Sequence, residues 1–425
     1  MVNNQRKLVA LALLRVERDG AYSNLVLNEA IRNSDLDKQA SAFVSVLFYG
    51  VLERKITLDY LITKLSSKPV KKISPLTLQV LRCALYQLLY MESIPPSAAV
   101  NEAVNIVKHS KESFASGFVN AVLRAALREM PSLPEDDSAD SLSVRYSCGK
   151  SLVLRFLNDY GCEKTKRILS NVLLESTIYI RVNTLKVTTD ELAELLTADG
   201  ITCEKTNVAD SLMIKGSGSI ERNRYYQEGY FHVQDLSSQL CAHSLNASAG
   251  NTVLDICAAP GGKTFTICEM MGDSGEIIAC DLHSHRVELI EKGAKRLGLK
   301  SIKTRSLDAT EEQKDFISKF DCVLCDVPCS GSGIITRKPD IKYKDFDNND
   351  ELHSIQYAIL KNAFSYLKAG GRLVYSTCSI LKSENEDIIN RLISNEEACL
   401  VSKKTLLPGI DDTDGFFISV LEKRG

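Results

Sequence analysis

Hydrophobic residues recur every three to four positions through the first third of the chain, which predicts amphipathic helices. The spacing is clearest in residues 37–65 and 77–91. We therefore expect an all-α domain over residues 1–130. The following stretch, 131–140, is rich in proline and acidic residues and is predicted to be a linker.

The next region mixes two kinds of pattern. Residues 177–185 alternate between apolar and polar positions, as in a strand, whereas residues 188–200 predict a capped helix that ends at a glycine. The sequence therefore predicts a small α+β domain over residues 141–235, between the helical domain and the rest of the chain.

From residue 236 onward, short apolar runs alternate with helical segments. The apolar runs are residues 251–257, 275–281, 302–308, 320–328 and 370–378. This rhythm favours an α/β Rossmann-like domain over residues 236–425, built on a mostly parallel sheet. The last apolar run, 414–423, has no helix of crossover length before it, so we expect it to be an antiparallel strand.

Composition narrows the class of protein. The 425-residue chain has a net charge of -2. Residues 1–130 contain 17 Lys and Arg against 11 Asp and Glu, a net of +6, which leaves -8 for the remainder. A basic first third indicates a polyanionic partner, with a solvated helical surface as the equal alternative.

An odd count of 13 cysteines fits a reducing compartment, so we expect a cytoplasmic protein without a membrane span. No apolar heptads remain for self-association, which predicts a monomer.

The stretch "DICAAPGGKT", residues 255–264, raises the first question of chemistry. Its end resembles a phosphate-binding loop, but such a loop needs a glycine where this chain has Cys257. A nucleotide triphosphatase is therefore disfavoured. A Gly-rich turn between a strand and a helix also lets the backbone approach a nucleoside cofactor closely, and Pro260, Gly261 and Gly262 provide such a turn.

Acidic residues end the successive strands that follow this turn. Asp281 ends the second strand and is placed to accept from ribose hydroxyls; Asp308 ends the third and could accept from an adenine amino group; Asp326 ends the fourth. Each alone could merely cap a turn. Because parallel strands end at one sheet edge, the series favours S-adenosylmethionine (SAM). NAD is the competitor, but its G-x-G-x-x-G pattern is absent.

Two cysteines, Cys329 and Cys378, each follow an apolar strand and are predicted to lie at that same edge. A thiolate that adds to carbon 6 of cytosine makes carbon 5 nucleophilic enough to accept a methyl group. Asp326 is placed to stabilise such an adduct, and a second cysteine could assist release. The alternative is that these are ordinary buried cysteines. Cys322 and Cys325 lie three apart in one strand and point to opposite faces, so no metal site is expected.

Several stretches resemble one known family. The match covers "CAAPGGKT", "DVPCSGSG" and "STCSI", with "FHVQDLSSQL" and "RKPDIKY" beside them. These are similar to signatures of the SAM-dependent RNA cytosine-C5 methyltransferases. Residues 81–104 and 117–124 resemble the helical, RNA-binding NusB fold. A NusB-like domain fused to this methyltransferase is the layout of the bacterial RsmB (Sun/Fmu) enzymes, which methylate one cytosine, cytosine 967, of 16S ribosomal RNA.

The resemblance implies roles for individual residues. Cys378 would be the nucleophile and Cys329 would promote product release; by analogy with DNA cytosine methyltransferases these roles would be exchanged. The cofactor would be held by one loop and by three acids at strand ends, namely Cys257, Ala258, Ala259, Pro260, Gly261, Gly262 and Lys263 with Asp281, Asp308 and Asp326. A transfer RNA substrate, and a NusB-like binding or assembly factor with an inert enzyme domain, are the alternatives.

The segment after the first cysteine loop contains candidate RNA contacts. Arg337, Lys338 and Lys342 could contact phosphates, with a solvated loop as the alternative. Tyr343 stands where the family usually has tryptophan and could stack on a base. A second departure is Cys148-Gly149, where relatives tend to have His-Pro.

Overall fold

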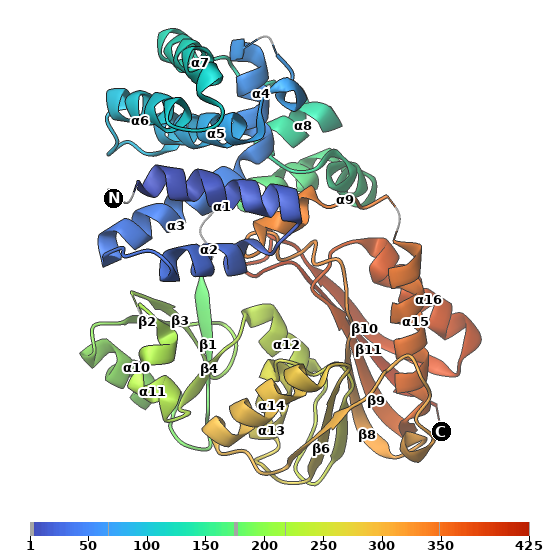
Figure 1. The fold of residues 1–425 in the computed structure, drawn as a ribbon. Helices are drawn as coiled ribbons and strands as arrows, with labels where there is room; N and C mark the ends of the chain where they lie inside the picture. The colour runs from blue at the N-terminus through green and yellow to red at the C-terminus, as the bar shows by residue number, and fades with distance from the viewer. Residues whose placement is uncertain (1–3, 67, 174–176, 217, 348, 425) are drawn as a thin grey trace. The chain divides into compact units, whose positions relative to one another are not determined.

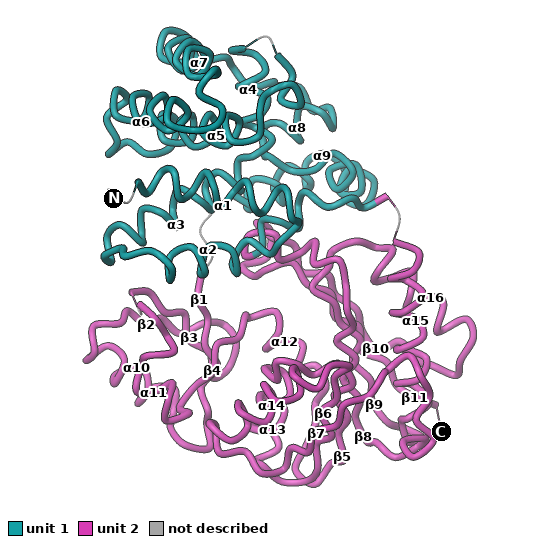
Figure 2. The backbone as a smooth tube through the Cα atoms, in the orientation of Figure 1, with its two compact units in different colours: residues 1–173, 338–346 teal, residues 174–337, 347–425 magenta. Residues whose placement is uncertain are grey.

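The protein is described by a computed structural model, and its residues group into two compact units (Figures 1 and 2). Unit 1 comprises residues 1–173 and 338–346, and unit 2 comprises residues 174–337 and 347–425. The structure describes residues 4–66, 68–173, 177–216, 218–347 and 349–424.

The regular secondary structure of unit 1 is helical and contains no strand among its described residues, as the periodicity predicts. Its helices are α1 (Gln5–Asp19), α2 (Ser23–Arg32), α3 (Lys38–Glu53), α4 (Lys55–Ser66), α5 (Pro75–Tyr90), α6 (Pro96–Lys108), α7 (Ser116–Arg128), α8 (Ala139–Tyr146) and α9 (Lys150–Asn171). The central helix is α5, which packs against α1, α3, α4, α6 and α7. Helix α5 is therefore buried on most of its surface, whereas each surrounding helix buries mainly one apolar face.

A buried arginine ties the centre of unit 1 together. Arg82 of α5 is 3% exposed. Its guanidinium lies 2.7 Å from a carboxylate oxygen of Asp59 and 2.7 Å from one of Glu17, so two carboxylates compensate the buried charge.

Unit 2 contains a four-stranded antiparallel sheet with strand order β2-β3-β1-β4. Its strands are β1 (Ile178–Val182), β2 (Thr202–Lys205), β3 (Ser211–Lys215) and β4 (Phe231–Val233), with helices α10 (Thr189–Ala198) and α11 (Arg224–Gln227). Thr188 and Glu191 form the capping box that starts α10. The region predicted as one α+β domain, 141–235, is divided between the units, because its first helices pack with unit 1.

The second sheet of unit 2 has seven strands in the order β10-β11-β9-β8-β5-β6-β7. They are β5 (Thr252–Asp255), β6 (Glu276–Asp281), β7 (Ile302–Ser306), β8 (Phe320–Asp326), β9 (Leu367–Thr377), β10 (Ala398–Leu406) and β11 (Phe416–Lys423). Strands β5 to β9 are parallel, and β11 runs antiparallel to β9, as predicted. Strand β10 is missing from the prediction, because this edge strand is largely exposed and the polar run Ser402–Thr405 interrupts its apolar residues.

Helices cover both faces of this sheet (Figure 1). One face packs against α12 (Leu236–Ser244), α13 (Gly262–Met270) and α14 (Ser284–Leu297), and the other against α15 (Asp350–Ser365) and α16 (Glu386–Asn395). Cys322 and Cys325 contribute to the cores on opposite faces, as strand alternation predicts. Among the described residues, no helix is both long and apolar enough to cross a membrane.

Candidate active site

A tight turn joins β5 to α13 at the carboxyl edge of the seven-stranded sheet. Gly261 has a φ of 109°, in the left-handed region that favours glycine. A Cβ at this position would lie 2.3 Å from the ring of Phe265, so a side chain is excluded by contact as well. The turn brings backbone, rather than side chains, against the space in front of the first turn of α13, where helix N–H groups lack partners.

A cavity of about 230 Å³ opens beside this turn. It is lined by Val233, Gln234, Asp235, Ser238, Asp255, Cys257, Ala258, Ala259, Pro260, Gly262, Lys263 and Asp326. Most residues of the predicted cofactor loop are therefore in its wall, together with the acid that ends β8.

Two buried polar atoms in the cavity wall have no hydrogen-bond partner among the described residues. One is Oδ1 of Asp255, whose Oδ2 accepts a 2.6 Å bond from Thr264. The other is Nε2 of Gln234, whose Oε1 accepts a 2.6 Å bond from Thr266. Burial raises the pKa of Asp255 to about 7. Buried polar atoms are normally satisfied, so an acceptor and a donor without a partner, on two residues that line the cavity, fit a polar ligand such as the amino acid end of SAM.

Lys263 and Asp326 form an ion pair across the cavity wall. Lys263 Nζ lies 2.7 Å from Oδ2 of Asp326, and Ser376 donates a 2.7 Å hydrogen bond to Oδ1. Burial disfavours the charge on Lys263, but the attraction of Asp326 outweighs it and raises the lysine's pKa. The carboxylate of Asp326 is thus held by two donors at the end of β8.

The two cysteines singled out in the sequence meet at this edge. Cys329 follows β8, Cys378 follows β9, and their sulfur atoms are 3.1 Å apart. The hydrogen bond with Cys378, together with burial, raises the pKa of Cys329 well above that of a free thiol. At this distance either thiol can donate a hydrogen bond to the other sulfur.

The other predicted cofactor acids lie at the ends of β6 and β7 but outside the cavity lining. Asp281 is 3% exposed and pairs with Arg286 at 3.0 Å. The same arginine donates a 2.8 Å bond to the carbonyl of Ala259, so it ties the end of β6 to the cofactor loop. Asp308 accepts from the backbone N–H and the hydroxyl of Thr310, which is the role of a turn cap.

Two of the predicted RNA contacts have exposed side chains. Lys338 is exposed and free to meet a phosphate. Arg337 is also exposed, but its guanidinium pairs with Asp235 at 2.7 Å and with Asp414. Because two carboxylates already compensate its charge, Arg337 has less to offer a phosphate than Lys338 has.

The other two predicted RNA contacts, Lys342 and Tyr343, pack within unit 1. Lys342 is fully buried and its ammonium donates a 2.6 Å hydrogen bond to the carbonyl of Glu53. The hydroxyl of Tyr343 donates to the carbonyl of Leu52. The carbonyl of Lys342 accepts from the N–H of Gly149 at 2.7 Å, where a proline would have no N–H to give. These contacts correct the expectation of a phosphate contact at Lys342, because its ammonium is buried against a carbonyl. The hydroxyl of Tyr343 is held, and stacking of its partly exposed ring on a base stays a prediction.

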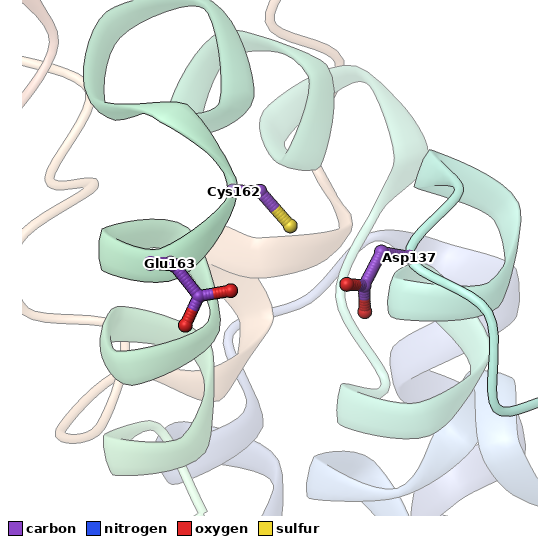
Figure 3. Close-up of side chains that lie close together, drawn as sticks. All are labelled: Asp137, Cys162 and Glu163. Carbon is purple, nitrogen blue, oxygen red and sulfur yellow. The ribbon is translucent and has the colours of Figure 1, made fainter.

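A further group of potential metal ligands lies in unit 1. Asp137, Cys162 and Glu163 point toward one another (Figure 3). Lys166 lies 3.0 Å from Asp137 and 2.8 Å from Glu163. This ammonium ion accounts for the gathering of the two carboxylates as an ion-pair network.

A doubly wound sheet whose first strand leads through a glycine turn into a helix, with a polar cavity at its carboxyl edge and an antiparallel strand beside β9, fits the class of SAM-dependent methyltransferases. Family comparisons agree. Residues 242–422 match the 16S rRNA methyltransferase RsmB/F family, residues 150–221 the ferredoxin-like domain of the RsmF/B-like methyltransferases, and residues 3–128 the NusB family. The chain belongs to the ribosomal RNA small subunit methyltransferase B (RsmB/F) family.

Individual relatives align from end to end. The probable ribosomal RNA small subunit methyltransferase B of Bacillus subtilis is 38% identical over 99% of both chains, and the Escherichia coli O1:K1 enzyme is 32% identical over 99% of both. Among solved structures, PH0851 aligns over 100% of both chains with a TM-score of 0.82 and 25% identity. A methyltransferase homologue from Pyrococcus horikoshii covers 68% of this chain and 100% of its own, with a TM-score of 0.61 and 26% identity.

Sequence reasoning missed four residues that the structure brings to the site. They are Gln234, Asp255, Arg286 and Glu384. Asp255 was within the quoted loop and could have been found from its place at the end of a buried strand. Gln234 lies within "FHVQDLSSQL", one of the stretches that resemble the family, and could have been found from that resemblance. Arg286 and Glu384 reach the site through Ala259 and Ser330, which are distant in the sequence, so no local signal marks that role.

Proposed function

We propose that this chain methylates carbon 5 of a cytosine in 16S ribosomal RNA, in the manner of the cytosine-967 enzyme that its layout resembles. The observation that supports it most is the 3.1 Å approach of two thiols from neighbouring strand ends. A single thiol would suffice for addition to a pyrimidine. A pair beside a carboxylate provides both for forming the covalent adduct and for resolving it.

In this proposal Cys378 attacks carbon 6 of the cytosine. The assignment follows the family that the chain resembles, in which the cysteine of the "STCS" motif is the nucleophile, and Cys329 lies 3.1 Å from its sulfur. Asp326, held by Lys263 and Ser376, would face ring nitrogen 3 and the exocyclic amine, where negative charge develops on addition.

Cys329 would then serve product release. After carbon 5 is methylated, a base, here solvent water, takes its proton. The electron pair of that bond re-forms the double bond between carbons 5 and 6, and the bond between carbon 6 and the Cys378 sulfur breaks, with its electron pair returning to sulfur. A second thiol 3.1 Å from that sulfur is within reach of the departing thiolate and can donate a proton to it.

The cofactor-binding residues would be the loop from Cys257 to Lys263, with Asp281, Asp308 and Asp326 at the neighbouring strand ends. SAM, when bound, supplies the methyl group on a sulfonium centre. Asp255 and Gln234 would add an acceptor and a donor in the cavity wall. Arg286 would orient the loop through the carbonyl of Ala259.

Covalent trapping tests the two thiol roles. Wild type, Cys329→Ala and Cys378→Ala are incubated with SAM and a 16S rRNA fragment and separated on a denaturing gel. We expect a slowly migrating protein–RNA band with Cys329→Ala, because release fails, and none with Cys378→Ala. A band with Cys378→Ala alone would exchange the two roles, as in the DNA enzymes. Absence of both a band and methyl transfer would support the inert, RNA-binding alternative.

The substrate is tested by the same assay with transfer RNA in place of the rRNA fragment. The match of residues 3–128 to the NusB family supports ribosomal RNA, since that domain is an addition to the catalytic core. Labelling of transfer RNA at a rate equal to that of 16S rRNA would favour the transfer RNA alternative.

A further inference from the structure

The loops that bear the two cysteines meet at one buried carboxylate. Glu384 ends a short 3-10 helix, η6 (Lys382–Glu384), and its side chain is fully buried. Among the described residues no lysine or arginine forms an ion pair with it. Its oxygens instead accept hydrogen bonds from uncharged donors, which is the usual requirement for keeping a carboxylate in the interior.

Those donors come from both cysteine loops. Oε2 of Glu384 accepts a 2.8 Å bond from the N–H of Ser330, and Oε1 accepts from the hydroxyl of the same serine. Oε1 also accepts a 2.8 Å bond from the hydroxyl of Ser379. Ser330 follows Cys329 and Ser379 follows Cys378, so one carboxylate fixes the neighbour of each thiol.

Further contacts hold the carboxylate itself in place. Tyr375 of β9 donates a 2.6 Å bond to the backbone carbonyl of Glu384. Gln356 of α15 donates to Oε2 at 3.1 Å and to the carbonyl of Pro328 at 3.0 Å, which adds a third element to the junction. Asn385 accepts from Thr377 at 2.6 Å. The junction is therefore anchored to β9 and to α15.

We infer that Glu384 is a positioning residue that sets the approach of Cys329 and Cys378, by bridging the serine that follows each of them. This inference rests on the proposed function, in which both thiols act on one cytosine. Glu384 does not line the cavity, so it acts through the two loops. Its negative charge also favours the protonated form of Cys329.

The approach of the thiols can be measured without substrate. Hydrogen peroxide oxidises a thiolate to a sulfenic acid with release of hydroxide, and a neighbouring thiol then displaces water to form a disulfide. Sulfur atoms 3.1 Å apart are close enough for this second step. Limited oxidation of the full-length protein, followed by alkylation and mass spectrometry of the peptides that contain Cys329 and Cys378, gives the rate of disulfide formation.

We expect Glu384→Ala to slow this disulfide at least about tenfold and single-turnover methyl transfer about 100-fold, the cost of a misplacement of about 1 Å. The KM for RNA should change less than about twofold. Glu397→Ala, an exposed position just before β10 and at the opposite edge of the sheet, removes the same charge and should match wild type in both assays. If Glu384→Ala unfolds the chain, Ser379→Ala removes one donor and should give the same two effects at smaller size.

Disulfide formation at the wild-type rate in a folded Glu384→Ala or Ser379→Ala variant would overturn the inference. So would a fall in melting temperature with an unchanged rate of methyl transfer per folded molecule. Failure of the proposed function is distinguishable, because then wild type would form the disulfide and still leave the RNA unmethylated.

Discussion

Two neighbouring stretches of the chain, residues 326–333 and 338–346, contain residues that the sequence marks as functional, and the structure gives them different surroundings. The first places Asp326 and Cys329 at the carboxyl edge of the large sheet, beside a polar cavity. The second packs into the helical unit, where Lys342 is fully buried. The position of a residue at a strand end is determined by the topology of the sheet. The position of a residue in a basic and aromatic loop is determined by contacts with residues far away in the sequence.

The largest effect is expected in the first stretch. Asp326→Asn keeps an acceptor for Ser376 but removes the negative charge opposite Lys263 and, in the proposed function, the carboxylate that would face the cytosine. Methyl transfer in a single turnover with saturating RNA should fall about 10²- to 10⁴-fold, the usual contribution of a general acid or base. The measurement is quenched-flow transfer of a labelled methyl group.

Asp321→Asn is the matched control. Asp321 lies at the opposite end of β8, where it accepts a 2.8 Å bond from the N–H of Thr252 and pairs with exposed Lys368. The chemical change is the same, and activity should stay within about threefold of wild type. Equal losses in the two variants would mean that strand β8, and not its carboxyl end, is what the substitution damages.

A second test addresses the burial of Lys342. Burial lowers its pKa to about 8 from an ordinary value of 10.5. Between these values the unfolded chain binds more protons than the folded one, so stability rises as pH increases from about 8 to about 10.5. The full effect is about 3 kcal/mol. Lys342→Met, which cannot titrate, should lack this rise.

Urea denaturation followed by far-UV circular dichroism at several pH values measures the difference between variant and wild type. Lys344→Met, two positions away on an exposed side chain, controls for the loss of a charge and should follow the wild-type curve. Parallel curves for wild type and Lys342→Met would place Lys342 in water and return it to the candidate RNA contacts.

The same contrast explains which parts of the structure could be predicted. The parallel strands, the antiparallel β11 and the meeting of Cys329 with Cys378 follow from apolar runs and from the rule that parallel strands end at one edge. Glu384 lies in the polar run "SENE", which reads as a solvated turn. Its role depends on Ser330, 54 positions earlier, and no local pattern records that contact.

The smallest effect compares two lysines of one segment that are four positions apart. Lys338 is exposed, and if it meets a phosphate, Lys338→Ala should reduce the slope of log affinity against log salt by about 1. Lys342→Met removes a charge that is already buried against the carbonyl of Glu53, so it releases no counterion on binding and should leave the slope unchanged. Fluorescence anisotropy with a labelled 16S rRNA fragment between about 50 and 200 mM salt resolves such a difference. Equal changes in both variants would show that Lys342 leaves its partner when RNA binds. No change in either would remove this segment from the RNA interface and leave the exposed basic residues of the helices as the candidates.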